Sequence, residues 1–258
     1  MVTDPIPGRA SPSTLQLIPS VEAVRAVELP DLSDFFNPFL RSFMEATCRV
    51  GGEVVVARGP TGVEGCSLYH PAEQLVSLFT RRPAVAMSLL ERRSRVEVFS
   101  ELPLGPGAEV YYVYEADLGA SGASHRFAHT VREVRPEDRA PLLSLLRELY
   151  GRVDEEWFRP IPAPPEKGFA IEVDGRIAGA GWVSLVGGHA RFHTLSVRPR
   201  CRRLGVGTDL WHARAQYARA RGAQKALMEV SENNRASQAI ATAGGMRRVG
   251  QMYRAYRP

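Results

Sequence analysis

The chain has 258 residues and a mass of 28.4 kDa, with 44% hydrophobic and 24% charged residues. These values are typical of a globular protein with one large domain or two ordinary ones, and they exclude a mainly disordered, collagen-like or coiled-coil chain. No apolar run approaches the ~18 residues of a membrane span, and residues 1–20 lack the apolar stretch of a secretory signal. We therefore expect a cytoplasmic protein without a membrane partner.

Charge divides the chain into two halves. Residues 1–127 hold 11 arginines against 15 acidic residues, whereas residues 128–258 hold 22 lysines and arginines against 13 acidic residues. Several of these arginines fall in one short segment, residues 190–207, and not in a long stripe interleaved with aromatic residues, so we expect no nucleic-acid partner. The three cysteines are scattered without metal-ligand spacing, which predicts reduced thiols and no metal site.

The first half shows the patterns of several strands and helices. An extended stretch at 24–31 is followed by a helical one at 35–43, a hairpin strand at 62–68, a strand, loop and helix at 75–90, and a strand at 95–101. The next residues, 102–109, read LPLGPGAE and have no helical pattern.

The second half has clearer boundaries. Residues 129–134 alternate like a strand, and Pro136 with the two acidic residues after it begins a helix that Gly151 ends. Strands at 168–173 and 176–186 flank an Asp-Gly turn and therefore predict a β-hairpin. The remaining elements are a strand at 189–197, a helix from 204–207 to Gly222, a strand at 225–231, a helix capped by Asn233 or Asn234 that ends at Gly244-Gly245, and a closing strand at 252–257.

The turn between residues 197 and 207 has the chemistry of an anion site. A strand runs directly into a glycine-containing turn and a helix, so the free N–H groups of the turn and the positive helix end point outwards together. Gly205 and Gly207 carry no Cβ that would keep a diphosphate away from the backbone, and Arg202 and Arg203 supply charge-assisted contacts. We therefore favour an anion-binding turn over a purely structural one.

Three segments together resemble the acetyl-CoA signature of the GNAT superfamily of N-acetyltransferases. They are LSVRP at 195–199, RRLGVG at 202–207 and NRASQAIATAGGM at 234–246. The resemblance covers residues 128–258 and includes the family's order of elements. It implies an α+β fold, with helices on both faces of a mainly antiparallel mixed sheet, and an enzyme that moves an acetyl group from acetyl-CoA to an amine by direct attack on the thioester.

The resemblance also implies which residues hold the coenzyme. The backbone of Leu195, Ser196 and Val197 is expected to pair with the pantetheine arm, and Asn234 is expected near the same arm. The diphosphate is expected in a cradle formed by Arg202, Arg203, Leu204, Gly205, Val206, Gly207 and Thr208.

One position departs from the family's pattern. Many members carry a tyrosine seven residues after the Asn, which protonates the departing thiolate, but this chain has Ala241 there. A free thiol with a pKa of ~8.5 leaves without full protonation, so the loss is compatible with activity. Tyr253 is the candidate replacement acid, and Tyr256 is a second one.

A general base is useful because an amine of the lysine type, with a pKa of ~10.4, is mostly protonated at neutral pH. Period-two alternation predicts that His193 shares one face of its strand with Leu195 and Val197. This places His193 near the expected acyl contacts and makes it the candidate base, with Glu229 and Glu232 as competitors.

The first half repeats the order of the second. VRAVELPD at 24–31 aligns with VREVRPED at 131–138, GVEGCSL at 62–68 with RIAGAGW at 176–182, 75–90 with 192–211, and RVEVFSE at 95–101 with ALMEVSE at 226–232. The first copy has a shorter turn, with Ala84 and Ala86 in place of the two glycines, and lacks the Asn-headed helix. We therefore predict tandem GNAT-like domains: a flexible tail at 1–20, a degenerate domain without a coenzyme site at 21–127, and a GNAT acetyltransferase domain at 128–258.

The sequence does not specify the acceptor, and a small-molecule or peptide amine is expected. Glu155, Glu156 and Trp157 fall where the family shapes its acceptor groove and would favour a cationic amine, although a solvated helix face is the commoner origin of such residues. The alternative to an enzyme is a coenzyme A binding or regulatory module without catalysis. A nucleic-acid-binding protein is the third and least supported possibility.

Overall fold

The computed structural model describes residues 20–24, 40, 44, 47–48, 51–60, 62–71, 74–91, 96–103, 105–119, 125–151, 166–186 and 188–257. The predicted tail, apart from Ser20, lies outside these residues, as do the segment 155–157 and most of the helical stretch predicted at 35–43. Those expectations stay predictions.

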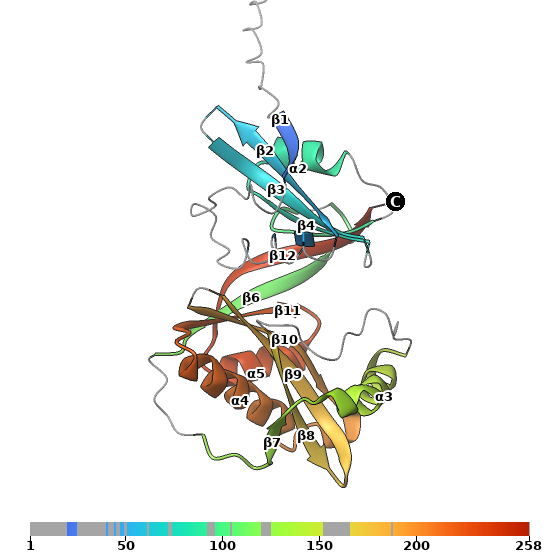
Figure 1. Ribbon diagram of the computed structural model, residues 1–258, viewed down its shortest axis with the longest axis vertical. Helices are drawn as coiled ribbons and strands as arrows, with labels where there is room; N and C mark the ends of the chain where they lie inside the picture. Colours follow the sequence, from blue (N-terminus) through green and yellow to red (C-terminus); the bar gives the residue numbers. More distant parts are fainter. Residues whose placement is uncertain are drawn as a thin grey trace, which may run out of the picture.

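Twelve strands within the described residues form one mixed sheet (Figure 1). The first half contributes β1 (Ser20–Val24), β2 (Glu53–Gly59), β3 (Gly62–His70), β4 (Leu75–Thr80), β5 (Val96–Ser100) and β6 (Glu109–Asp117). The second half contributes β7 (Val131–Glu133), β8 (Glu166–Val173), β9 (Arg176–Val186), β10 (His189–Val197), β11 (Lys225–Ser231) and β12 (Arg247–Arg257). Among their pairings only β4–β5 and β10–β11 are parallel, which confirms the mainly antiparallel sheet.

The strand order reads the same from both edges of the sheet. From one edge it runs β1 to β5 and then β12, and from the other it runs β7 to β11 and then β6, with the parallel pair at the same place in each series. The last strands are exchanged, because β6 of the first half pairs with β11 and β12 pairs with β5. At the centre β6 and β12 pair with each other, so the two halves share one continuous sheet (Figure 1).

Four α-helices can be bounded within the described residues: α2 (Pro83–Leu90), α3 (Arg139–Tyr150), α4 (Val206–Ala220) and α5 (Arg235–Ala243). α3 buries its leucines against Ala180 and Trp182 on one face of the sheet. α4 buries Val206 and Leu210 against Phe192 on the opposite face. Helices therefore cover both faces, as predicted, and none of these four is long and apolar enough to cross a membrane.

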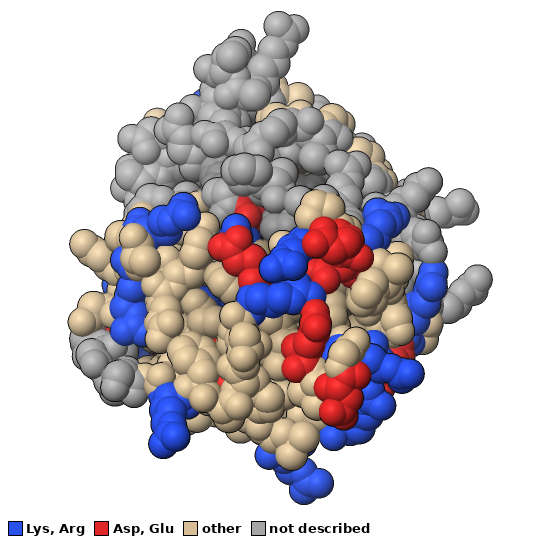
Figure 2. All heavy atoms as spheres, turned by 60° about the horizontal axis from the view of Figure 1, so that its bottom comes forward, with Lys and Arg blue, Asp and Glu red and all other residues tan. Residues whose placement is uncertain are grey.

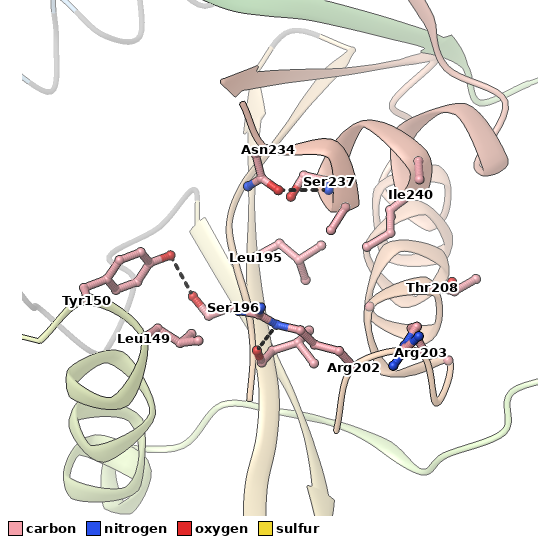
Figure 3. Close-up of a pocket in the computed structure, with 15 residues that line it drawn as sticks. Leu149, Tyr150, Leu195, Ser196, Arg202, Arg203, Thr208, Asn234, Ser237 and Ile240 are labelled. Atoms are coloured by element: carbon pink, nitrogen blue, oxygen red, sulfur yellow. Dashed lines mark hydrogen bonds between the residues drawn. The ribbon is translucent and has the colours of Figure 1, made fainter. Parts of the chain in front are cut away.

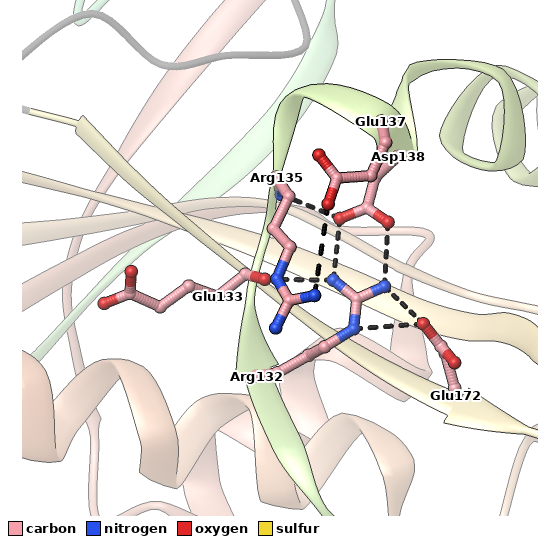
Figure 4. A network of polar contacts seen from close by, with 6 residues as sticks. All are labelled: Arg132, Glu133, Arg135, Glu137, Asp138 and Glu172. Carbon is pink, nitrogen blue, oxygen red and sulfur yellow. Dashed lines mark hydrogen bonds and ion pairs between the residues drawn. The ribbon is translucent and has the colours of Figure 1, made fainter.

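A polar network fixes the predicted helix start at Pro136 (Figure 4). A 3-10 turn (Pro136–Asp138) precedes α3, and Asp138 accepts hydrogen bonds from the Arg135 N–H and from both terminal nitrogens of Arg132, each at 2.7 Å. Glu172 of β8 pairs with Arg132 as well. The hydrogen bonds from Arg132 lower the pKa of Asp138, so the network is charged at neutral pH and ties β7, β8 and α3 together.

The predicted helix ends are also confirmed. Gly151 and Gly222 follow α3 and α4 with φ of 78° and 83°, a backbone conformation in which residues other than glycine are strained. Asn234 caps α5, because its side-chain oxygen accepts a hydrogen bond from the Ser237 N–H at 3.1 Å. These local signals set the end of α4 and the start of α5, and the start of α5 forms one wall of the site below.

Candidate functional site

A cavity of about 600 Å³ opens between the end of β10, the start of α4 and α5 (Figure 3). Most of the residues predicted to hold the coenzyme line it: Leu195, Ser196, Val197, Arg202, Arg203, Gly205, Gly207, Thr208 and Asn234. The sequence did not indicate the other lining residues, which are Leu149, Tyr150, Ala236, Ser237, Ala239 and Ile240. The four on α5 recur at helical spacing after Asn234, a signal that could have found them.

Two predicted coenzyme residues do not line the cavity with their side chains. Leu204 is 56% exposed, and Val206 is buried in the core under α4. The contacts expected of both residues were those of their backbone N–H groups, so the positions of their side chains leave that prediction open.

The cavity exists because β10 and β11 separate. The two parallel strands pair only at His189–Arg191 with Lys225–Leu227, after which β11 continues along β6 as far as Ser231. Where the strands part, Arg191 Nε donates to both carboxylate oxygens of Glu229 at 3.1 and 3.0 Å. Beyond this ion pair the edge of β10 faces the cavity, so its peptide groups are available to an extended ligand.

β10 contains a β-bulge that the alternation pattern did not predict. His193 pairs with Trp182 and Ser196 pairs with Ala180, so β10 has one residue more than β9 between these pairs. Directly paired residues share a face, which puts His193 and Ser196 on the face covered by α3. Leu195 packs on the opposite face with the core under α4. The prediction that His193 shares a face with Leu195 is therefore wrong, because the extra residue reverses the alternation.

The turn before α4 has the geometry of an anion site. Arg203 and Gly205 have φ of 62° and 88°, and Gly205 is the N-cap of α4, so the first N–H groups of the helix have no partner within it. Arg202 and Arg203 are exposed and line the cavity beside these groups. Free N–H groups, two cations and the positive end of a helix therefore coincide at one end of the cavity.

The two glycines of this turn have physical roles in addition to the one predicted. A Cβ at Gly207 would lie 2.7 Å from Cδ1 of Ile240, so the missing side chain lets α5 pack beside the start of α4. Gly205 is required by its positive φ, and a Cβ there would have Ala128 and His129 as its nearest neighbours. Both glycines thus shape the cavity through the backbone and through helix packing, and not only by leaving room for a ligand.

His193 belongs to a polar cluster on the α3 face. Its Nε2 lies 3.0 Å from Oγ of Ser184, which donates a hydrogen bond of 3.1 Å to Glu166. Burial, helped by the charges of Arg191 and Arg214, lowers the pKa of His193 well below its ordinary value. Burial raises the pKa of Glu166, although the hydrogen bond from Ser184 and the charge of Arg191 act to lower it. The imidazole is therefore neutral at pH 7, which is the form that accepts a proton.

The structure does not bring the other candidate catalytic residues to the cavity. Tyr253 of β12 lies between β5 and β6, and its hydroxyl contacts Gln251. Tyr256 is 66% exposed on the same strand. Ala241, where the family has its tyrosine, is fully buried in the core. His193 lies next to the bulge but is not one of the residues that line the cavity.

The residues of the cavity fit acetyl-CoA in two respects. The cations and free N–H groups at the start of α4 suit a diphosphate, and the β10 edge that faces the cavity suits the amide groups of a pantetheine arm. Within the part of the chain that the structure describes, no three His, Cys, Asp or Glu side chains are grouped so that they could hold a metal ion.

The sequence of the second half matches a known family. Residues 131–244 match the Acetyltransferase (GNAT) family, and this span includes every residue that lines the cavity. This part of the chain is therefore similar to GNAT acetyltransferase domains. A comparison with curated protein sequences found no match.

Solved structures extend the similarity to nearly the whole chain. A GCN5-related N-acetyltransferase from Sphaerobacter thermophilus is 15% identical, with a TM-score of 0.64 over 95% of this chain and 98% of that one. A tandem GNAT protein from the clavulanic acid biosynthesis pathway is 15% identical, with a TM-score of 0.58 over 92% and 98%. A Drosophila protein is 13% identical, with a TM-score of 0.67 over 92% and 98%. At these identities the similarity shows the fold, and it shows a GNAT-like fold that includes the first half.

Proposed function

We propose that the protein is an acetyl-CoA-dependent N-acetyltransferase that moves an acetyl group to an amine by direct attack on the thioester. The observation that carries this proposal is the cavity where β10 and β11 part, because its cationic end is the start of α4 with Arg202 and Arg203. The GNAT match over residues 131–244 supports the same assignment. A small-molecule or peptide amine is the proposed acceptor.

The residues of the cavity have distinct proposed roles. Acetyl-CoA, when bound, supplies the activated acyl group. Arg202, Arg203 and the N–H groups as far as Thr208 hold its diphosphate, while the backbone of Leu195–Val197 and the side chain of Asn234 hold its pantetheine arm. Backbone N–H groups of β10 polarise the carbonyl, a role that requires no particular side chain.

His193 is the proposed general base. The acceptor nitrogen must lose one proton, and His193 takes it directly or through a water molecule. Ser184 and Glu166 lie 3.0 and 3.5 Å from His193 Nε2, and the side chain of Glu166 is 39% exposed. The cluster therefore offers the proton a route from the imidazole to solvent.

We further propose that the first half is a degenerate copy without a coenzyme site. The mirrored strand order supports a duplication. Only Arg81 and Arg82 separate β4 from α2, whereas residues 198–205 separate β10 from α4. Arg82 is ion-paired with Glu64, and α2 begins with a proline, which has no N–H, so this turn offers an anion fewer donors and less free charge.

The charge on one face also bears on the choice of partner. The lower end of the molecule in Figure 1, turned forward in Figure 2, carries basic and acidic side chains close together. A polyanion on this face would meet repulsion as well as attraction. The proposed partners are therefore amines of small molecules or peptides, and not nucleic acids.

A coenzyme A binding module without catalysis is the second candidate function. It is favoured by the buried Ala241, which leaves α5 without a phenol, and by the position of His193 outside the cavity lining. Transfer assays separate the two candidates, because a module binds the coenzyme but acetylates none of a broad panel of amines.

Calorimetry with acetyl-CoA tests whether the cationic end of the cavity binds the coenzyme. We expect the double substitution Arg202→Glu and Arg203→Glu to weaken binding at least ~10-fold, because charge-assisted hydrogen bonds contribute ~1.5–3 kcal/mol each. Arg200→Glu is the matched control, since Arg200 is exposed in the same turn but does not line the cavity. No binding by the parent protein would overturn both candidate functions. Equal binding by the parent and the double variant would overturn the assignment of the diphosphate to Arg202 and Arg203.

A further inference from the structure

Two hydroxyl groups from different elements meet at the edge of the cavity. Tyr150 is the last residue of α3, Ser196 follows the bulge in β10, and their side-chain oxygens are 3.5 Å apart (Figure 3). Both residues line the cavity. Ser196 is 2% exposed, whereas Tyr150 is 64% exposed, so burial of the ring does not account for the position of the phenol.

The two hydroxyls lie on the α3 side of the cavity, across from Arg203, while Arg202 lies between and donates to the carbonyl oxygen of Val197 at 3.4 Å (Figure 3). Arg203 and Thr208 mark the α4 end, whereas Tyr150 and Ser196 lie on the side of α3 (Figure 3). The inference that follows rests on the proposed function. With a diphosphate bound at the α4 end, the thioester belongs at the end where these hydroxyls meet.

α5 has no phenol at the position where many members of the family that the second half resembles carry one. Its lining residues include two alanines and an isoleucine, and Ala241 is buried away from the cavity. Among the described residues that line the cavity, Tyr150 is the only phenol. The described part of the cavity wall thus has one tyrosine, which lies across from α5 (Figure 3).

We propose that Tyr150, oriented by Ser196, is the catalytic acid that protonates the departing thiolate. In this step the acceptor nitrogen forms a C–N bond with the carbonyl carbon, the C–S bond breaks with its electron pair on sulfur, and Tyr150 gives its hydroxyl proton to that sulfur. Tyr150 recovers a proton from solvent, while the proton of the amine leaves through His193. The products are an N-acetyl amine and a free thiol, so no oxidant or reductant is needed.

Tyr150→Phe tests this role because it removes the hydroxyl and keeps the ring. We expect kcat to fall about 100-fold with little change in the KM for acetyl-CoA, the effect of losing one general acid. A second measurement does not depend on turnover. The thiolate of bound coenzyme A, followed by its ultraviolet absorbance, is expected to titrate at higher pH in Tyr150→Phe, because a hydrogen-bond donor favours the charged form.

Two controls make the result specific. Desulfo-coenzyme A has no sulfur for Tyr150 to contact, so it is expected to bind the parent and Tyr150→Phe equally. Tyr217→Phe, on α4 and not among the residues that line the cavity, is expected to match the parent in every measurement. Equal melting temperatures of the parent and both variants show that each has folded.

The outcomes separate this inference from the proposed function. If Tyr150→Phe titrates the bound thiol as the parent does, the inference is overturned, whether or not kcat falls. If the parent itself binds no coenzyme A, the proposed function fails. A shifted thiol titration in Tyr150→Phe alone, together with the fall in kcat, supports Tyr150 as the acid.

Discussion

Arg214 of α4 is a fully buried cation, and its replacement by methionine is expected to stabilise the protein. Its Nε and one terminal nitrogen donate to the carbonyl oxygens of Leu210 and Trp182 at 3.1 and 3.3 Å. The other terminal nitrogen has no hydrogen-bond partner in the part of the chain that the structure describes. Burial lowers the pKa of Arg214 to about 9, so the fold holds this charge at a cost in free energy.

The magnitude follows from this pKa. Against an ordinary value of ~12.5, and at 1.36 kcal/mol for each pH unit, keeping the cation buried costs about 5 kcal/mol. This cost is fully present below pH 9, where Arg214 is charged in both the folded and the unfolded protein. It declines as the pH rises from 9 towards the ordinary pKa of arginine. Methionine gives up two charge-assisted hydrogen bonds, worth ~1.5 kcal/mol each at these long distances, and a cation–π contact with Phe192 worth ~1 kcal/mol. The expected net gain is about 1 kcal/mol in the free energy of unfolding.

Urea unfolding at pH 7 measures this difference. Arg219→Met, on the same helix, is the matched control and is expected to change stability by less than ~0.5 kcal/mol. Because the charge of Arg214 also helps to lower the pKa of His193, Arg214→Met is expected to move the NMR titration of His193 to higher pH. A loss of more than ~2 kcal/mol in Arg214→Met would refute the reasoning, since it would mean that the cation stabilises the fold.

Three further substitutions have defined outcomes. Asp209→Asn is expected to cost ~3 kcal/mol in urea unfolding at pH 7, because the buried carboxylate anchors the segment at 125–129. Burial alone would raise the pKa of Asp209, but the hydrogen bonds from that segment outweigh burial and lower the pKa. The difference in stability between Asp209→Asn and the parent should therefore narrow as the pH falls through ~4. Gly244→Ala is expected to cost ~2 kcal/mol because its Cβ would lie 2.4 Å from the Trp211 ring, while Gly250→Ala, with 4.0 Å of room, should leave the melting temperature nearly unchanged. His193→Gln is expected to lower kcat about 100-fold and to abolish the acidic limb of the pH–rate profile, which in the parent should lie well below pH 6.5 because the pKa of His193 is lowered; an unchanged profile would exclude His193 as the base.

Much of the second half could be predicted because its signals are local. Gly222 ends α4 and Asn234 caps α5, and each acts within one turn of helix. The Asp-Gly turn joins β8 and β9 as a hairpin for the same reason. Gly205, with its positive φ, is a local signal of the same kind in the turn before α4, and most residues predicted for the coenzyme line the cavity.

The bulge in β10 and the position of Tyr150 could not be predicted in this way. Thr194 has φ of 50°, but threonine does not favour that region, so nothing in the sequence marks the extra residue. Tyr150 faces the cavity because α3 packs on the sheet beside β10, and this depends on contacts between segments far apart in sequence. The face of His193 and the proposed acid therefore required the structure.

The exchange of β6 and β12 makes each half depend on the other for its last strand. β6 contributes Tyr114 and Ala116 to the core under α4, as does Leu118 directly after it, and β6 separates β11 from β12. A chain cut between residues 127 and 128 would leave β12 without either of its neighbours. Local sequence patterns give no indication of this dependence, because the pairing joins residues far apart in sequence, such as Glu115 and Arg247.

Truncation tests the exchange directly. A chain of residues 128–258 holds every residue that lines the cavity but lacks β6, so we expect it to be aggregated or unfolded by gel filtration and near-ultraviolet circular dichroism. A chain of residues 105–258 restores β6 between β11 and β12, and it is expected to recover a cooperative melting transition because Tyr114, Ala116 and Leu118 return to the core. If residues 128–258 alone gave a monomer that melts cooperatively, the strand pairing at the centre of the sheet would not be what holds the second half together.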